Sequence, residues 1–183
     1  RRFVVLCDDA YFGLAYEPAV AKESLFTKLV NRHPNLYPVK LDGATKEDYV
    51  WGFRVGFMTF PGPAKVAEAM EKKAAGAVRG AISNVSQLSQ SVLLKAMASP
   101  TYKQDKRRKF DLMKGRYDAV KAVLSKPDYA DVWTPYPFNS GYFFCMKLKG
   151  LNAETYRLYL LEKHGVGLIA TAPTDVRVDR KST

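Results

Sequence analysis

The sequence predicts an α/β fold followed by a smaller α+β unit, and three observations support this. Short apolar runs such as Phe3–Cys7 alternate with helical segments through the first part of the chain. One long helix then follows the break at Ser99-Pro100. After that helix come a strand, a helix and two short strands. We therefore expect one domain over residues 1–99, and a linking helix with a small α+β domain over residues 100–183.

The expected elements of the first domain follow from capping residues and chain breakers. Phe3–Cys7 is a continuous apolar run, typical of a buried parallel strand. Ser24 caps a helix that ends near Arg32. Pro38 argues against a central position for its strand. We further expect strands at Leu36–Leu41 and Arg54–Phe60, a helix at Ala64–Ala75, a loop at Gly76–Ala81, and a helix that runs from a capping box at Asn84 and Gln87 to Ala98.

In the second domain, hydrophobic periodicity defines the long helix, about Tyr102–Leu124. Its apolar residues recur every three or four positions and form one stripe. The strand Tyr142–Leu148 carries apolar side chains on one face. A helix over Ala153–His164 is closed by Gly165. The remaining expected strands are Gly167–Ala170 and Asp175–Asp179.

Composition places the chain among globular proteins. Its 183 residues are 47% hydrophobic and 13% aromatic, which is enough for a real core. No apolar run approaches the roughly 18 residues that would span a membrane, and no secretory signal is visible. Cys7 and Cys145 lie in strand-like runs, so we expect buried free thiols and a reducing, cytoplasmic compartment.

The net charge of +11 raises the question of a nucleic-acid partner. The densest basic run, Lys103–Lys109, belongs to the long helix, where we interpret it as the solvated face. If the chain is a piece of a larger protein, its charge is not that of the whole. We therefore expect no nucleic-acid partner. A basic nucleic-acid-binding module remains an alternative, favoured by charge alone, and its binding would fall steeply with salt.

The stretch LDGATKEDYVWGFRVG, residues 41–56, holds the strongest chemical signal. Lys46 follows a glycine turn, and Arg54 comes eight residues later between Gly52 and Gly56. A lysine amine can form a Schiff base with an aldehyde cofactor, and an arginine fork matches a phosphate. This stretch resembles the cofactor-lysine segment of the fold-type I pyridoxal-phosphate enzymes, the large aminotransferase family. The resemblance implies that Lys46 holds the cofactor and Arg54 its phosphate. Taken alone, the stretch could equally be a loop lysine and a strand-edge arginine.

A second match to this family lies at the end of the first strand. Asp8 and Tyr11 have the spacing of the family's aspartate, which faces the pyridine nitrogen, and its tyrosine, which bonds the ring's 3-oxygen. The resemblance implies these cofactor-binding roles here. The alternative is a solvent-facing turn with Asp9 as a cap, which explains the two acids but not the tyrosine.

Two arginines resemble the family's substrate-binding residues. Arg177, in TDVRV, matches the arginine that binds the substrate α-carboxylate. The alternative is a surface ion pair with Asp175 or Asp179, which would contribute little stability. Arg79, in ARGAISN, resembles an arginine that reaches the partner subunit's site in aspartate-type enzymes and binds a distal carboxylate. A solvated arginine after a helix is an equally good interpretation.

The sequence departs from the family pattern in two ways. Gly43 stands where the family often has a Ser or Thr that donates to the phosphate, so Thr45 or a backbone amide would take that role. The first half of the family fold is also absent. Other chemistries lack a signal: the two histidines show no metal-ligand spacing, and there is no phosphate-binding P-loop or serine elbow.

The resemblance implies part of the large domain of a fold-type I enzyme, followed by a small carboxy-terminal domain. It implies an aminotransferase that moves an amino group between an α-amino acid and a 2-oxo acid through a Schiff base of pyridoxal phosphate on Lys46. Substrates of the aspartate or glutamate type and a homodimer are expected, with no metal. A β-lyase, a decarboxylase or the cofactor-sensing domain of a regulator could share these residues. Inactivity of the 183 residues on their own would not contradict the family.

Overall fold

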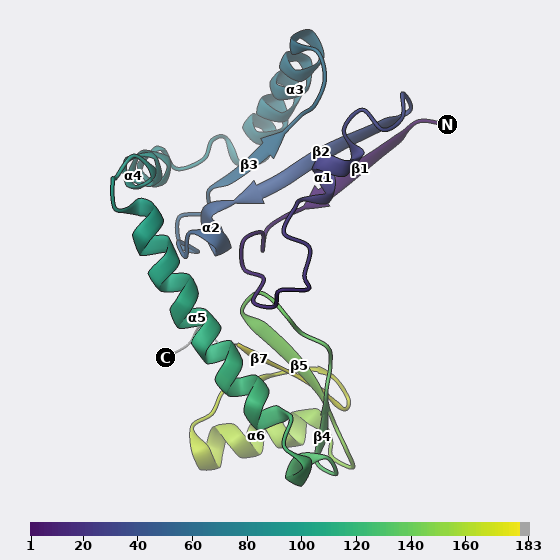
Figure 1. The fold of residues 1–183 in the computed structure, drawn as a ribbon, viewed down its shortest axis with the longest axis vertical. Coiled ribbons are helices and arrows are strands. Elements are labelled where there is room, and N and C mark those ends of the chain that lie inside the picture. Colours follow the sequence, from purple (N-terminus) through teal and green to yellow (C-terminus); the bar gives the residue numbers. More distant parts are fainter. Residues whose placement is uncertain (180–183) are drawn as a thin grey trace. The chain divides into compact units, whose positions relative to one another are not determined.

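The computed structural model describes residues 1–179, which fold into two compact units (Figure 1). The first unit comprises Arg1–Ala15 and Ala19–Lys106, and the second comprises Tyr16–Pro18 and Arg107–Thr183. Helix α5 (Tyr102–Leu124) begins in the first unit and continues without a break into the second. None of the helices in the described range has the length and hydrophobicity needed to cross a bilayer.

The first unit is built on a three-stranded sheet of order β1-β2-β3. Its strands are β1 (Phe3–Asp8), β2 (Leu36–Gly43) and β3 (Gly56–Thr59). Strand β1 is parallel to β2 and places Asp8 opposite Leu41. Strand β3 is antiparallel to β2 and places Gly56 opposite Gly43. The ends of β1 and β2 and the start of β3 therefore meet at one end of the sheet, where Figure 1 shows α2 (Ala44–Glu47).

Pro38 argues against a central position for its strand, but β2 lies between β1 and β3. Pro38 is fully buried and stands opposite Val5 of β1. Strand β3 pairs only with Lys40–Gly43, so Pro38 lies beyond the part of β2 that has neighbours on both sides. A missing backbone donor is tolerated there because no strand is bonded to that side of the proline.

The helices of the first unit confirm one predicted cap and correct two other predictions. Ser24 caps α1 (Leu25–Leu29) by accepting a hydrogen bond from the Phe26 amide. The predicted loop at Gly76–Ala81 is wrong, because α3 (Ala64–Ile82) runs through it. Alanine has the highest helix propensity, and the many alanines of α3 offset its two glycines.

The predicted capping box at Asn84 and Gln87 is also wrong. Helix α4 (Gln87–Met97) begins after Ser86, whose hydroxyl accepts a hydrogen bond from the Ser89 amide. The side chain of Asn84 instead accepts from the next amide, that of Val85. Serine and asparagine are both good cap residues, so the pattern alone could not separate two positions two residues apart.

The second unit contains a four-stranded antiparallel sheet of order β4-β5-β7-β6. Its elements besides α5 are η1 (Pro127–Tyr129), β4 (Trp133–Pro135), β5 (Phe143–Leu148), α6 (Ala153–His164), β6 (Ile169–Ala172) and β7 (Asp175–Asp179). The predicted apolar face of β5 is confirmed, since Phe144, Met146 and Leu148 are all buried. They pack with Val176 of β7 and with Val120, from the predicted stripe of α5. Gly165 closes α6 with φ +65°, as predicted.

Candidate functional site

The loop over residues 44–55 connects β2 to β3 and carries Lys46 and Arg54. It starts and ends beside the paired residues Gly43 and Gly56. Its end residues, Ala44 and Val55, are buried and cluster with Leu93 of α4. Helix α4 therefore anchors both ends of the loop, and the backbone on either side of Lys46 and Arg54 is held in place.

Lys46 and Tyr11 are close to one another at this end of the sheet. The Lys46 Nζ lies 5.4 Å from the centroid of the Tyr11 ring, within the range of a cation–π interaction. Lys46 is in α2, which follows β2, and Tyr11 is in the turn that follows β1. The parallel pairing of β1 with β2 explains why Lys46 and Tyr11 are close, because the segments that carry them leave the sheet from the same end.

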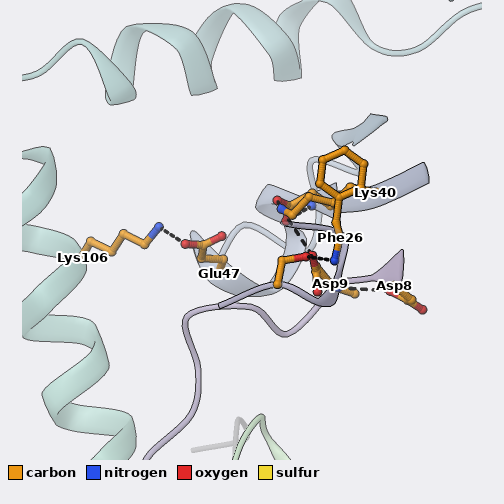
Figure 2. Close-up of polar contacts among 10 residues, drawn as sticks. Asp8, Asp9, Phe26, Lys40, Glu47 and Lys106 are labelled. Carbon is orange, nitrogen blue, oxygen red and sulfur yellow. Dashed lines mark hydrogen bonds and ion pairs between the residues drawn. The ribbon is translucent and has the colours of Figure 1, made fainter. Parts of the chain in front are cut away.

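Asp8 and Asp9 have different surroundings (Figure 2). The Asp9 carboxylate accepts a 2.5 Å hydrogen bond from the Ser24 hydroxyl and lies 3.6 Å from the Lys40 Nζ. The Asp8 carboxylate accepts a 3.1 Å hydrogen bond from the Ala10 amide, and Asp8 is exposed. Asp9 is therefore part of the internal packing of the unit, whereas the Asp8 carboxylate faces outward at the end of β1.

Lys40 was not singled out from the sequence, although a charged residue in a mostly apolar central strand is a signal of a buried ion pair. Its amine contacts Asp42 as well as Asp9, and all three side chains are mostly buried. Burial opposes the charge of Lys40, but the hydrogen bond and charge of Asp42, together with Asp9, outweigh it and raise the pKa of the amine. This cluster joins the end of β1 to β2 beneath the site.

The prediction that Arg54 opens a strand is wrong, because β3 starts at Gly56 and Arg54 lies in the loop before it. Arg54 is exposed and has φ +54°, and Tyr49 of the same loop has φ +61°. Left-handed backbone is unfavourable for these residue types by about 1 kcal/mol or more and tends to occur at functional sites. The strain in this loop favours a functional role for Arg54.

Gly43 has a steric explanation. A Cβ built on Gly43 would lie 3.0 Å from the carbonyl oxygen of Val55, which is backbone and cannot move aside easily. The two sides of the loop approach too closely here for any side chain. The Ser or Thr that the family often has at this position would therefore not fit this loop as it stands.

Arg177, the candidate for the substrate carboxylate, lies in β7 of the second unit, whereas the candidate cofactor residues lie in the first. Its guanidinium packs 4.7 Å from the centroid of the Phe143 ring. Its Nε is buried and has no hydrogen-bond partner among the described residues. Asp175 accepts a 2.9 Å hydrogen bond from Tyr136. A buried guanidinium donor without an acceptor is unfavourable, so the surroundings of Arg177 favour an anionic ligand.

Arg79 is not brought to the other candidate residues by any described contact. It lies in the last turn of α3, not in a loop after a helix, and it is exposed. Its guanidinium donates a 2.8 Å hydrogen bond to the Ser83 hydroxyl. The described residues thus give Arg79 no link to Lys46.

Comparison with known families identifies the family of this chain. The family described as "Aminotransferase class I and II" matches residues 1–180. The chain belongs to this family. Its members depend on pyridoxal phosphate. No curated protein matches the chain.

Solved structures of aminotransferases have the same fold. One is LysN, an α-aminoadipate aminotransferase from Thermus thermophilus complexed with N-(5'-phosphopyridoxyl)-L-leucine, at 23% identity and a TM-score of 0.75 over 97% of this chain and 45% of that one. Another is the aspartate aminotransferase of Thermotoga maritima, at 21% identity and a TM-score of 0.72 over 98% and 43%. A third is a Methanococcus jannaschii protein whose active site is similar to those of kynurenine aminotransferases, at 16% identity and a TM-score of 0.74 over 98% and 46%.

These similarities confirm the predicted fold class, a fold-type I α/β architecture. The chain spans less than half the length of each of these structures. At these identities the likeness establishes the fold alone, and the named enzymes act on chemically different amino acids. The prediction of an aspartate or glutamate substrate therefore stays a prediction.

Proposed function

We propose that this protein is an aminotransferase that transfers an amino group from an α-amino acid to a 2-oxo acid with pyridoxal phosphate as its cofactor. One observation supports this above the others. In a chain of this family, the fold gathers Asp8, Tyr11, Lys46 and Arg54 at one end of a single sheet. Ligands of α/β proteins bind at the carboxyl ends of parallel strands, which is where Asp8 lies.

The chemistry of these four side chains fits the cofactor. The Lys46 amine is the group that can bind an aldehyde, and the Arg54 guanidinium suits a phosphate. The Asp8 carboxylate can hold a protonated pyridine nitrogen, and the Tyr11 phenol can donate to a ring oxygen. Asp9, the other acid nearby, is already engaged with Ser24 and Lys40. The surroundings of the two acids therefore support Asp8 for the pyridine nitrogen.

The roles of the protein groups follow from this assignment. When bound, pyridoxal phosphate supplies an electron sink that makes the α-proton of an amino acid removable. Asp8 keeps the ring nitrogen protonated, and Arg54 anchors the phosphate. Arg177, with its unsatisfied Nε, binds the substrate α-carboxylate. Lys46 acts as the general base at the α-carbon, for which its amine must first lose its own proton.

Loss of Lys46 tests this function directly. Pyridoxal phosphate gains a visible absorbance band when a protein amine binds its aldehyde, so the full-length protein should become coloured with the cofactor. Lys46→Ala should abolish the band, because it removes the amine proposed to bind the aldehyde. Lys72→Ala is the matched control, since Lys72 is an exposed lysine of α3 that pairs with Glu68. A band that survives Lys46→Ala would refute the assignment.

Substrate assays then separate reaction and substrate classes. A transaminase converts amino-acid and oxo-acid pairs, whereas a β-lyase would release pyruvate and ammonia. We propose that Arg79 favours dicarboxylic amino acids by reaching the site of a second subunit in a cytoplasmic homodimer. Arg79→Ala should then lower kcat/KM for glutamate or aspartate more than for an apolar amino acid. An equal effect on both substrates would remove this role.

A further inference from the structure

Four charged or hydroxyl side chains form a cluster at the end of α2, the helix that carries Lys46. The function proposed above assigns them no role. Two of them, Glu47 and Asp48, follow Lys46 in sequence. The other two, Tyr102 and Lys106, lie one turn apart at the start of α5. All four belong to the first unit.

The contacts within this cluster are close and specific. The Lys106 Nζ donates a 2.6 Å hydrogen bond to the Glu47 carboxylate, which is drawn in Figure 2, and lies 3.4 Å from Asp48. The Tyr102 hydroxyl donates a short hydrogen bond to the same Asp48 carboxylate. The Asp48 side chain is only 8% exposed. The start of α5 is thereby fastened to the two residues after Lys46.

Glu47 also lies close to the segment that carries Tyr11. A Cβ built on Gly13, two residues after Tyr11, would lie 3.0 Å from the Glu47 Oε1, and Gly13 has φ +78°. The Glu47 carboxylate therefore lies between Gly13 and Lys106. The Glu47 side chain thus joins the loop that carries Lys46 to α5 and lies close to the turn that carries Tyr11.

The protonation states of Lys106 and Tyr102 stabilise the hydrogen bonds of the cluster. Burial opposes the charge of Lys106, but its hydrogen bond to Glu47 and the charges of Glu47 and Asp48 outweigh this and raise its pKa. Burial raises the pKa of Tyr102, and its hydrogen bond to Asp48 raises it further. At neutral pH the amine is therefore charged and the phenol protonated, which is what each contact requires.

We infer that Glu47 and Lys106 are positioning residues. They fix the position of the Lys46 amine relative to the Tyr11 ring, so that the start of α5 controls the rate at which Lys46 binds the cofactor. This inference rests on the proposed function. Neither residue touches the reacting atoms, so they act through the backbone of α2 and through Gly13. An amine displaced by about 1 Å from its reacting position can lose on the order of a hundredfold in rate. A partial displacement would give a smaller loss.

The test compares two lysine–glutamate pairs of equal length in the full-length protein. Lys106→Met removes the partly buried pair Lys106–Glu47, and Lys72→Met removes the exposed pair Lys72–Glu68, which is also 2.6 Å long. The readouts are hydrogen exchange of the amides of residues 44–50 and the rate at which cofactor-free protein captures pyridoxal phosphate. We expect Lys106→Met to speed the exchange and to slow capture by about tenfold, with Lys72→Met close to wild type. Glu47→Gln should slow capture in the same direction.

Each outcome has a distinct meaning. Exchange in residues 44–50 that is no faster in Lys106→Met than in Lys72→Met would overturn the inference. Faster exchange with unchanged capture would overturn it too, because the contact would hold the loop without positioning Lys46. A wild-type protein that captures no cofactor would instead overturn the proposed function, together with the positioning role that depends on it. Loss of the folded state in Lys106→Met is detected by circular dichroism, and Glu47→Gln then decides the question by the same two readouts.

Discussion

The two sheets of this protein differ in how much of their hydrophobic surface the chain itself covers. In the second unit, Val176 is 0% exposed and Leu148 is 2% exposed, with α5 and α6 side chains packed against them. In the first unit, Val4 and Leu6 of β1 are 66% and 62% exposed. The apolar run that predicts a buried strand is thus largely uncovered within this chain.

The difference shows that a sequence pattern and the burial in one chain answer different questions. The apolar run of β1 is a feature of the sequence, whereas its exposure is measured in this chain alone. The solved structures with this fold are more than twice as long as this chain. In the second unit, side chains of the helices and strands bury one face of the sheet. Side-chain substitutions on the two sheets should therefore have unequal effects on the stability of residues 1–183.

The largest expected effect is that of Leu148→Ala. Removing a buried leucine leaves a cavity and should destabilise the second unit by about 3 kcal/mol. Leu6→Ala is the matched control on the exposed strand, where the expected loss is below about 1 kcal/mol because little burial is removed. Urea denaturation of the 183-residue chain measures both. Equal losses would show that β1 is covered in solution and that the two sheets do not differ in this way.

A smaller effect on stability is expected where the two ends of the loop over residues 44–55 approach each other. Gly43→Ala places a Cβ 3.0 Å from the Val55 carbonyl oxygen, which should cost about 2 kcal/mol by forcing the two sides of the loop apart. It should also weaken cofactor binding, because the loop carries both Lys46 and Arg54. Gly52→Ala is the control in the same loop, where the added Cβ meets open space and stability should change by less than about 0.5 kcal/mol. Denaturant midpoints and cofactor titrations report the two effects, and similar values for both variants would contradict the steric argument.

The sequence predicted those parts of the fold that depend on local periodicity and on single capping residues. The long helix, the apolar face of β5 and the cap at Ser24 are examples. It failed where local signals compete, as in the extension of α3 through Gly76 and Gly80, where the helix propensity of the alanines outweighs the two glycines.

At the candidate site, too, local patterns predicted some features and could not predict others. Residue type and spacing selected Lys46, Tyr11 and Asp8, and the parallel pairing of β1 with β2 explains why such distant positions meet. Spacing could not reveal the left-handed backbone of Arg54, which depends on how the loop closes against α4. Nor could it reveal the contact of Lys106 with Glu47, because ion pairs between distant segments leave no local pattern.

The two units should also differ in how their stability depends on pH. In the second unit, hydrogen bonds from Lys121 and Tyr117 lower the pKa of Glu17. A carboxyl whose pKa is lower in the folded state adds stability above its ordinary pKa of about 4.3, and this stability is lost as pH falls through the folded value. In the first unit, the pKa of Lys40 is raised, because its carboxylate partners outweigh burial. Its contribution is present below the ordinary lysine pKa of about 10.4 and is lost as pH rises through the folded value.

Glu17→Gln should therefore flatten the acid side of the stability profile, and Lys40→Met should flatten the alkaline side. Each unit has its own tryptophan, Trp51 in the first and Trp133 in the second, so Trp→Phe variants allow fluorescence to follow one unit at a time. With Trp133 as the reporter, Glu17→Gln should lower the stability to urea above about pH 4.3, and its difference from wild type should shrink as pH falls below that value. With Trp51 as the reporter, Lys40→Met should lower the stability below about pH 10.4, and its difference from wild type should shrink as pH rises above that value. If both reporters respond to both variants, the units unfold together, and the contrast between the two sheets is one of burial but not of independent stability.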